Sequence, residues 1–268
     1  MTRIAVIGHV EWVTFADGDV PAPGEIALLA DPFAVAAGAG AVVAVELAEA
    51  GVEAMFYTAL GRDAAGDASQ RFLAERGVDV RAARPDAPQT AALTILSPDH
   101  ERTIMVIGDN LHPQAADDLG WDDLATVDAV YFTGGDPATL VAARAAPLLV
   151  VTARRLAVLA ASGVRADVLI GSANDPGERV DAIALPAEPG AIVQTRGGEG
   201  GSWTCADGSG GSWEAAEPPG PVRDAYGAGD CFHAALTAAL AAGAEMAEAT
   251  AAGARAGAEA LTRRGPYR

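Results

Sequence analysis

Short apolar runs recur along most of the chain and alternate with segments of helical periodicity. The apolar runs predict strands at residues 4–8, 54–59, 78–82, 129–133, 148–152, 168–170 and 191–195. Helical patterns lie between several of them, at residues 38–50, 67–76, 138–145 and 156–162. Buried strands that alternate with helices are typical of a mostly parallel sheet with helices on both faces. The chain is therefore predicted to form a doubly wound α/β fold.

Two stretches depart from this alternation. Residues 91–96 and 103–107 are rich in β-formers and are joined by 97-SPDHER-102, which predicts a hairpin. Residues 9–37 look irregular, with Pro21, Pro23 and Pro32 as breaks. An inserted β-lid over one edge of the sheet would explain both stretches. We therefore expect one domain over residues 1–268, with a lid formed by segments of about 9–33 and 90–108.

Length and composition indicate a soluble globular protein. The chain has 268 residues, enough to bury a large core, and 50% of them are hydrophobic. No apolar run is long enough to span a membrane, and the first residues lack the order of a signal peptide. Cys205 and Cys231 have no paired spacing, which argues against a disulfide framework or a zinc site. We expect a cytoplasmic protein that does not bind membranes.

The charge of the chain excludes some functions. The formal net charge is −18, so the surface should repel phosphate backbones, and nucleic acid is not expected as a partner. Every basic residue is an arginine and there is no lysine. A Schiff-base lysine and a Walker-type phosphate lysine are therefore both excluded.

The stretch 224-DAYGAGD-230 places a glycine-rich turn directly before an apolar helical pattern. The start of a helix offers unpaired N–H groups and partial positive charge, and glycines allow those groups to approach an anion closely. Gly227, Ala228 and Gly229 could thus form an anion hole. Asp230 would stand beside it as a general base for an attacking hydroxyl group. The simpler alternative is that Asp230 only caps a helix after a tight turn.

This stretch is similar to the D-T-x-G-A-G-D signature of the ribokinase-like (PfkB) carbohydrate kinases. Further segments resemble that family in the same order along the chain. They are the opening strand and loop at 4–13, the helix start at 36–51, the strand, turn and helix at 57–80, the hairpin with Glu101, Arg102 and Thr103, and the nucleotide loop 193-VQTRGGEGG-201. The resemblance covers nearly the whole chain and implies a ribokinase-like fold with a small β-lid.

The resemblance implies a role for each matching position. Asp230 matches the catalytic base, Gly227, Ala228 and Gly229 match the anion hole, and Asp224 matches a position that helps to hold a monovalent cation such as K⁺. ATP would bring Mg²⁺, which Asn174 and Glu178 would help to organise. Residues 250–261 would form one wall of the adenine pocket. The residues implied to contact ATP are Thr195, Gly197, Gly200, Gly227 and Gly229.

The departures from the family pattern lie mainly on the acceptor side. Ala225 replaces the usual threonine of the signature, and Glu178 stands one residue late in the N-x-x-E motif. The implied acceptor contacts are Glu11 in place of an aspartate, Gly38, Gly40, and Val42 in place of a sugar-binding asparagine. A site built for ribose would lose a polar contact to the sugar through that last change. The resemblance therefore implies an ATP-dependent kinase for a hydroxyl group of another small sugar or sugar-like alcohol.

Two other functions remain open from the sequence. A nucleoside kinase on the same fold would need an aromatic sandwich for the base, for which Trp12 and Phe15 are candidates. A non-catalytic homologue that binds a sugar or a nucleotide would explain Val42 and the displaced Glu178. A dinucleotide-dependent oxidoreductase is excluded, because Gly8 does not begin a G-x-G-x-x-G motif. The family also implies a possible homodimer through the lid, whose exposed strands would need covering.

Overall fold

Alternate residues of the buried strands separate into two hydrophobic cores. The structure, a computed structural model, describes residues 1–97, 102–181 and 183–268. In β1 (Arg3–Ile7), Ile4 and Val6 belong to one core, whereas Ala5 and Ile7 belong to the other. The strands β4 (Glu53–Ala59) and β8 (Ala129–Phe132) divide in the same way. Because successive side chains point to opposite faces of a sheet, this division requires a sheet that is covered on both sides.

That sheet has nine strands among the described residues and confirms the predicted mostly parallel architecture. Seven neighbouring strands are parallel, and β12 and β13 add an antiparallel hairpin at one edge. In order across the sheet, the strands are β13 (Gly210–Trp213), β12 (Gly201–Cys205), β11 (Ala191–Thr195), β10 (Val168–Ser172), β9 (Leu148–Thr152), β8, β1, β4 and β5 (Asp79–Ala83).

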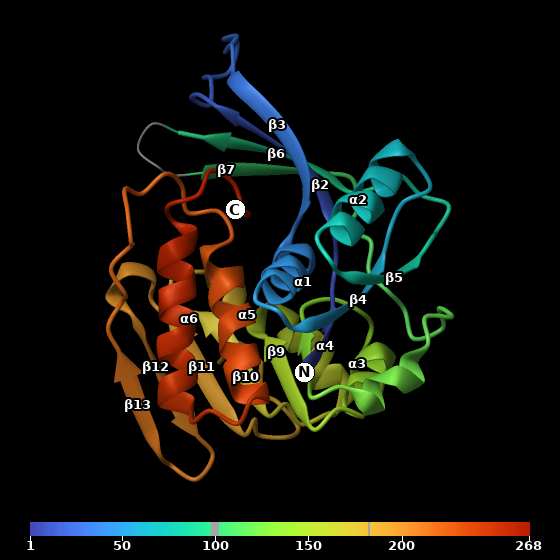
Figure 1. Cartoon of the computed structure of the whole chain (residues 1–268), viewed down its shortest axis with the longest axis vertical. Helices are drawn as coiled ribbons and strands as arrows, with labels where there is room; N and C mark the ends of the chain where they lie inside the picture. The colour runs from blue at the N-terminus through green and yellow to red at the C-terminus, as the bar shows by residue number, and fades with distance from the viewer. Residues whose placement is uncertain (98–101, 182) are drawn as a thin grey trace.

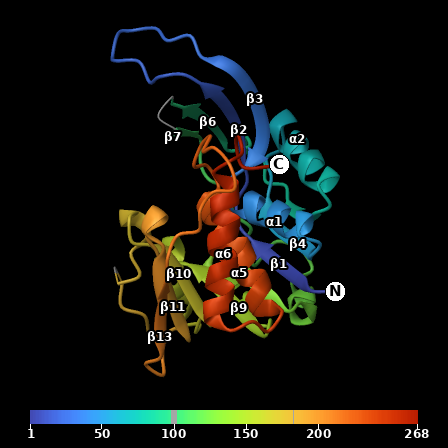
Figure 2. The same cartoon turned by 60° about the vertical axis from the view of Figure 1, so that its left-hand side comes forward.

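Helices cover the two faces unequally. The first core contains residues of α1 (Ala39–Glu49), α2 (Ala64–Glu75), α5 (Ala228–Ala241) and α6 (Met246–Ala260). The second core contains residues of α3 (Pro137–Ala143) and α4 (Leu156–Ser162), together with the short helix η1 (Trp121–Thr126). α5 and α6 lie side by side in both views (Figures 1 and 2). No helix in the described part of the chain is long and apolar enough to cross a membrane.

The helix predicted at residues 67–76 begins three residues earlier than expected. Asp63 caps α2, because its Oδ1 atom accepts a hydrogen bond from the Gly66 N–H at 2.8 Å. An aspartate that satisfies a free N–H group is a strong helix start. The predicted start did not take Asp63 into account as a cap, so it missed the first turn, Ala64 to Gly66.

A second sheet stands beyond the main one (Figure 1). Its order is β3 (Ala30–Ala37), β2 (Glu11–Asp17), β6 (Ala91–Leu96) and β7 (Arg102–Ile107). β6 and β7 pair antiparallel, which confirms the predicted hairpin for its described residues; Glu101 lies outside them. The chain leaves β1 and enters β2 after only three residues, so the second sheet rises directly from the main one.

The prediction that residues 9–37 are irregular was wrong. The segment Glu11–Asp17 alternates buried and half-buried side chains, as a strand should, and pairs with β3. Pro21 and Pro23 lie in the connection between these strands. Pro32 lies in β3, at the edge of the sheet and beside a register shift, where a missing N–H group is tolerated. The prolines therefore mark a loop and a bulge rather than an unstructured segment.

The order of strands reverses at β1. From β1 the chain passes to β4 and β5 on one side and later to β8, β9, β10 and β11 on the other. In open α/β sheets, the carboxyl ends of the strands at such a reversal form a crevice where ligands bind. The residues that follow β1 and β8 are therefore the first place to look for a site.

The last residues of the chain are tied to α1 by a buried ion pair. The Nη1 atom of Arg263 lies 2.9 Å from Oε2 of Glu46, and both side chains are almost fully buried. Tyr267 donates a hydrogen bond from its hydroxyl group to the Ala36 carbonyl oxygen at 2.6 Å. Together these contacts hold the segment after α6 against the start of α1.

Replacing Arg263 with methionine should lower the free energy of unfolding by about 3 kcal/mol, because Glu46 would remain buried without its close partner. Urea denaturation measures the change. Arg255→Met is the matched control, since Arg255 is exposed on α6 and its loss should change the stability by less than about 0.5 kcal/mol. An equal effect of the two substitutions would show that the buried pair adds nothing.

Candidate active site

The turn before α5 has the conformation that only glycine adopts easily. Gly227 is the N-cap of α5 and has φ 77°, in the left-handed region. The first N–H groups of a helix, here those of Ala228, Gly229 and Asp230, have no partners within the helix. The N–H group of Ala228 makes a long hydrogen bond, 3.5 Å, to the Ala225 carbonyl oxygen before the helix. A side-chain carbon added at Gly229 would meet no atom within 4 Å. The predicted anion hole is therefore open at Gly229.

The side chain of Asp224 holds this turn in place through two hydrogen bonds. Its Oδ1 atom accepts a hydrogen bond from the Tyr226 N–H at 2.8 Å, and its Oδ2 atom accepts one from the Gly265 N–H at 2.7 Å. The side chain is almost fully buried. Both carboxylate oxygens thus already have donors, and Asp224 connects the turn to the last residues of the chain.

Asp230 lies in the first turn of α5 and is partly buried. The pKa of its carboxyl group is raised from 3.8 to about 7, chiefly by burial and also by the negative charge of Glu178. The positive charges of Arg102 and Arg154 act in the opposite direction on this pKa. A carboxyl group of this kind is half ionised near neutral pH, as suits a general base.

Glu178 and Asp175 share one arginine. The guanidinium group of Arg154 donates to Oε1 of Glu178 at 2.8 and 3.1 Å and to Oδ2 of Asp175 at 2.6 Å. Oε2 of Glu178 also accepts a bond from the Ser172 N–H at 3.2 Å. The predicted magnesium-organising residue Glu178 is therefore fixed at the end of β10, opposite Asp230. In the described part of the chain, no group of three or more acidic, histidine or cysteine side chains could hold a metal ion.

The predicted nucleotide residues lie at the end of the neighbouring strand. Thr195 ends β11, and its carbonyl oxygen accepts a bond from the Ala173 N–H at 2.9 Å. Gly197 begins the short helix η4 (Gly197–Glu199) and is exposed. A side-chain carbon added at Gly197 would lie 3.6 Å from Nδ2 of Asn174. Gly200 is different: it is buried, and an added side-chain carbon would lie 2.0 Å from the Trp213 carbonyl oxygen. Gly200 therefore allows close packing on β13.

The predicted acceptor residues surround the start of α1. Gly38 has φ 87°, and a side-chain carbon there would lie 3.2 Å from the His9 ring and 3.4 Å from Cγ of Glu11. Glu11 is buried, and burial raises its pKa. Gly40 lets the helix approach the end of β1, since an added side-chain carbon would lie 2.8 Å from the His9 carbonyl oxygen.

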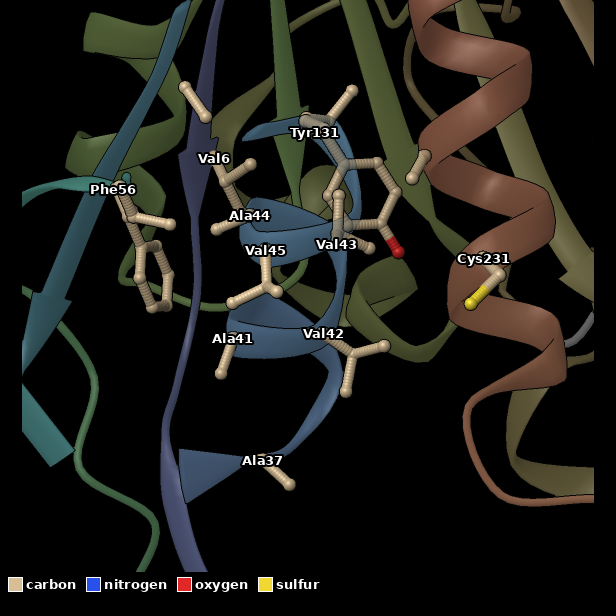
Figure 3. Packing of buried hydrophobic residues seen from close by; sticks show 14 of the residues in the cluster. Val6, Ala37, Ala41, Val42, Val43, Ala44, Val45, Phe56, Tyr131 and Cys231 are labelled. Atoms are coloured by element: carbon tan, nitrogen blue, oxygen red, sulfur yellow. The ribbon is translucent and has the colours of Figure 1, made fainter. Parts of the chain in front are cut away.

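A direct contact between Val42 and an acceptor does not fit the structure. Val42 has no exposed surface and belongs to the core between the sheet and α5. Figure 3 shows its side chain directed from α1 toward α5, on the side where Cys231 lies. It also lies 3.4 Å from the position of a side-chain carbon on Gly227, behind the anion-hole turn. A hydrophobic residue is suited to this position because the space is dry.

Three further polar residues meet at the reversal of the strand order, and none of them is among the predicted site residues. His9 follows β1, His112 follows β7, and Arg155 ends the short helix η2 (Ala153–Arg155) after β9. The His9 and His112 rings are 5.5 Å apart and edge to face, and Nη2 of Arg155 lies 3.2 Å from Nε2 of His112. A signal was present for His9, which directly follows a predicted buried strand, and for Arg155, which comes three residues after another. His112 comes from a long connection and gave none.

The aromatic sandwich that a nucleoside kinase would need is not available in β2. Phe15 has no exposed surface, stacks on Phe33 at 4.9 Å between ring centroids and meets the Tyr226 ring edge-on at 4.8 Å. Trp12 is half-buried, but Phe15, the second residue of the predicted sandwich, lies in the core. The residues that kept this alternative open therefore build the core under the second sheet.

The fold agrees with a comparison of the sequence with known families. A sequence model of the pfkB family carbohydrate kinases matches residues 1–163 and 163–268. The two segments cover the whole chain, so the chain belongs to this family. No curated protein sequence matches it at a significant level.

Solved structures show the same fold. A putative ribokinase from Agrobacterium tumefaciens has a TM-score of 0.81 at 22% identity, covering 99% of this chain and 93% of its own. Arabidopsis thaliana ribokinase, solved with ribose and ATP, has a TM-score of 0.75 at 19% identity, with 99% and 94% covered. Escherichia coli phosphofructokinase-2, solved with potassium, has a TM-score of 0.77 at 17% identity, with the same coverage. At these identities the likeness shows the fold, which confirms the predicted ribokinase-like architecture.

The pKa of Asp230 can be tested directly. Titration of its side-chain ¹³C signal should give a midpoint near pH 7, and Glu178→Gln should lower that midpoint because it removes a repelling negative charge. Glu199→Gln is the matched control, since Glu199 is exposed in η4. A wild-type midpoint near the ordinary value of 3.8 would contradict the effect of burial.

Proposed function

We propose that this chain is an ATP-dependent kinase that phosphorylates a hydroxyl group of a small sugar or sugar-like alcohol, with Asp230 as its general base. One observation carries the proposal. A carboxyl group with a pKa of about 7 stands in the first turn of α5, beside N–H groups that have no partner within the helix. The membership of the chain in a carbohydrate kinase family supports the same reaction.

In the proposed reaction, Asp230 accepts the proton of the acceptor hydroxyl group as its oxygen bonds to the γ-phosphorus of ATP. The bond from that phosphorus to the bridging oxygen of ADP breaks, and ADP leaves with the electron pair. The N–H groups of Gly227, Ala228 and Gly229 donate hydrogen bonds to the phosphoryl oxygens in transit. Donors that are fixed in advance stabilise such charge without reorganising.

ATP would bind at the ends of β10 and β11. Thr195 and Gly197 offer an accessible loop, with Asn174 beside it, and α6 would provide the second wall of the adenine pocket as proposed for residues 250–261. Gly200 would support this loop through its packing. Mg²⁺ would arrive with ATP and neutralise charge between the phosphates. Glu178 fits a role in organising it, since its negative charge already acts on Asp230.

A monovalent cation such as K⁺ would act beside the same turn. Both oxygens of Asp224 accept backbone N–H bonds, so we assign to Asp224 the placement of the turn, and backbone carbonyl groups would supply the ligands. The second sheet would serve as the lid of a single catalytic domain. Arg102, at the start of β7, lowers the pKa of Asp230 and would therefore lie close enough to act on bound phosphates.

The enzymatic test compares wild type and Asp230→Asn in ADP release from MgATP, with and without K⁺, across sugars, sugar acids, sugar phosphates, polyols and nucleosides. We expect one acceptor class to be turned over by the wild type and a loss of about 10²–10⁴-fold in the variant, because the positioned base is gone. Turnover of nucleosides alone would support a nucleoside kinase. Sugar binding without turnover would support a non-catalytic protein.

The same variant controls for folding through a pH effect with a fixed sign. The pKa of Asp230 is about 7 in the folded chain against an ordinary 3.8, so the stabilisation from binding its proton declines as pH rises through this window. Asparagine does not ionise and has no such decline. At about pH 8 the Tm of Asp230→Asn should therefore equal or exceed that of the wild type. A lower Tm would show that lost activity reflects damage to the fold.

The free edge of the second sheet supports a homodimer. β7 is an edge strand, and its apolar side chains Ile104, Met105, Val106 and Ile107 are between 41% and 62% exposed. An exposed apolar edge strand is a ready surface for a second chain. We propose that the same strand of a second copy covers it.

Sedimentation velocity tests the dimer. The wild type should sediment as a dimer, and Ile107→Asp should shift it toward the monomer, because a carboxylate would be buried at the interface. Ile183→Asp is the matched control, since Ile183 is 40% exposed and lies far along the chain from this strand. A monomeric wild type would contradict the proposal.

A further inference from the structure

Two consecutive arginines at the end of β9 differ in what surrounds them. Arg154 is bound by two carboxylates, Asp175 and Glu178. Arg155 is half-buried, and its guanidinium group donates to the Thr133 carbonyl oxygen at 2.7 Å and lies 3.2 Å from Nε2 of His112. Among the described residues, no carboxylate forms an ion pair with Arg155. Its positive charge is therefore held at the site without a negative partner.

The histidines next to Arg155 add polar atoms that also lack partners. Arginine can only donate, so Nε2 of His112 must accept and the proton of this ring must be on Nδ1. The Nδ1 atom of His112 is buried with no hydrogen-bond partner, and so is Nδ1 of His9. His9 itself is only 8% exposed. A buried N–H donor without an acceptor is costly, which indicates that a ligand or water completes this cluster.

Burial keeps both rings neutral at physiological pH. Burial is the largest cause, and together with the charge of Arg155 it lowers the pKa of His9 to about 3 and that of His112 to about 4. The histidines therefore neither compensate nor repel the arginine charge. Within the described ranges, Glu11 is the one acidic side chain paired with this cluster, and its Oε1 atom lies 3.7 Å from Nε2 of His9 rather than at Arg155.

The cluster occupies the acceptor side of the proposed active site. Its members follow β1, β7 and β9, and Thr133 follows β8, so they meet where the strand order reverses. His9 also lies beside Gly38 at the start of α1, where an added side-chain carbon would be 3.2 Å from its ring, and Glu11, 3.7 Å from His9, raises the pKa of Asp230. The unpaired charge is thus carried by elements other than the turn before α5, and Glu11 connects the two groups of residues.

We propose that Arg155, with His112 and His9, binds an anionic group of the phosphoryl acceptor, so that the acceptor is a sugar acid or a sugar phosphate rather than a neutral sugar. This proposal rests on the proposed kinase function, because only a kinase has a phosphoryl acceptor. Carboxylate and phosphate share the oxyanion that a guanidinium group binds through two parallel N–H bonds. Glu11 would remain free to accept hydrogen bonds from the hydroxyl groups of the same molecule.

The test compares Arg155→Met with the wild type on matched sets of hexonates, hexose phosphates and neutral hexoses. For an anionic acceptor, KM should rise by about 10–100-fold in the variant, while kcat changes much less, because Arg155 does not touch the transferred phosphoryl group. Arg155→Lys should recover part of the loss. Arg71→Met, which removes the same charge from the exposed face of α2, should leave KM unchanged. The two anionic sets show whether a carboxylate or a phosphate is bound.

Other results have defined meanings. If neutral hexoses are used as well as anionic sugars by the wild type, and Arg155→Met leaves KM for the anionic sugars unchanged, the anion subsite is overturned and the kinase function still stands. If no compound is phosphorylated, thermal shifts decide, with inorganic phosphate included to measure binding at the start of α5. A rise in Tm with an anionic sugar that Arg155→Met loses and Arg71→Met keeps would support the subsite and overturn the kinase function. No rise with any anionic sugar would overturn the subsite.

Discussion

The buried carboxylate of Asp224 is the constraint on which the proposed site depends. One oxygen accepts the Tyr226 N–H and the other accepts the Gly265 N–H, so a turn and the end of the chain share a single side chain. This fixes the left-handed Gly227 between Val42 and Pro266, and that position sets where α5 begins. Because the direction of a helix start determines where its free N–H groups point, the anion hole is defined by contacts behind it.

The electrostatics of the site combine two opposing requirements. Phosphoryl groups require positive charge nearby, whereas a carboxylate base requires a pKa that is not lowered too far. In this chain, burial and Glu178 raise the pKa of Asp230, and Arg102 and Arg154 only partly offset them. Arg154 can stay close because Asp175 and Glu178 already pair with its charge. Within a chain of net charge −18, the local balance around Asp230 thus differs from that of the surface.

The sequence allowed the main sheet to be predicted because its strands are buried on both faces and read as continuous apolar runs. The prediction was wrong for β2 and β3. The three prolines in this region indicate breaks, and the alternating pattern of β2 is only seven residues long. Motif spacing found Asp230 and its turn, since these are local in sequence. It could not show that Val42 points into the core, nor that His112 meets Arg155 across 43 positions. Contacts between loops depend on strand order, which no local pattern contains.

The buried position of Val42 is also consistent with a chain that departs from the family pattern at the proposed acceptor residues but keeps the turn before Asp230. A polar residue there would face the packing between α1 and α5, so in this chain the position supports Gly227 and leaves acceptor recognition to other elements. The polar groups around the crevice come instead from residues after β1, β7 and β9. These segments are not part of the turn that Asp224 fixes, so their side chains can change without moving the base. In the site that we propose, acceptor specificity and phosphoryl transfer would in this way be carried by separate parts of the fold, which meet near the start of α1.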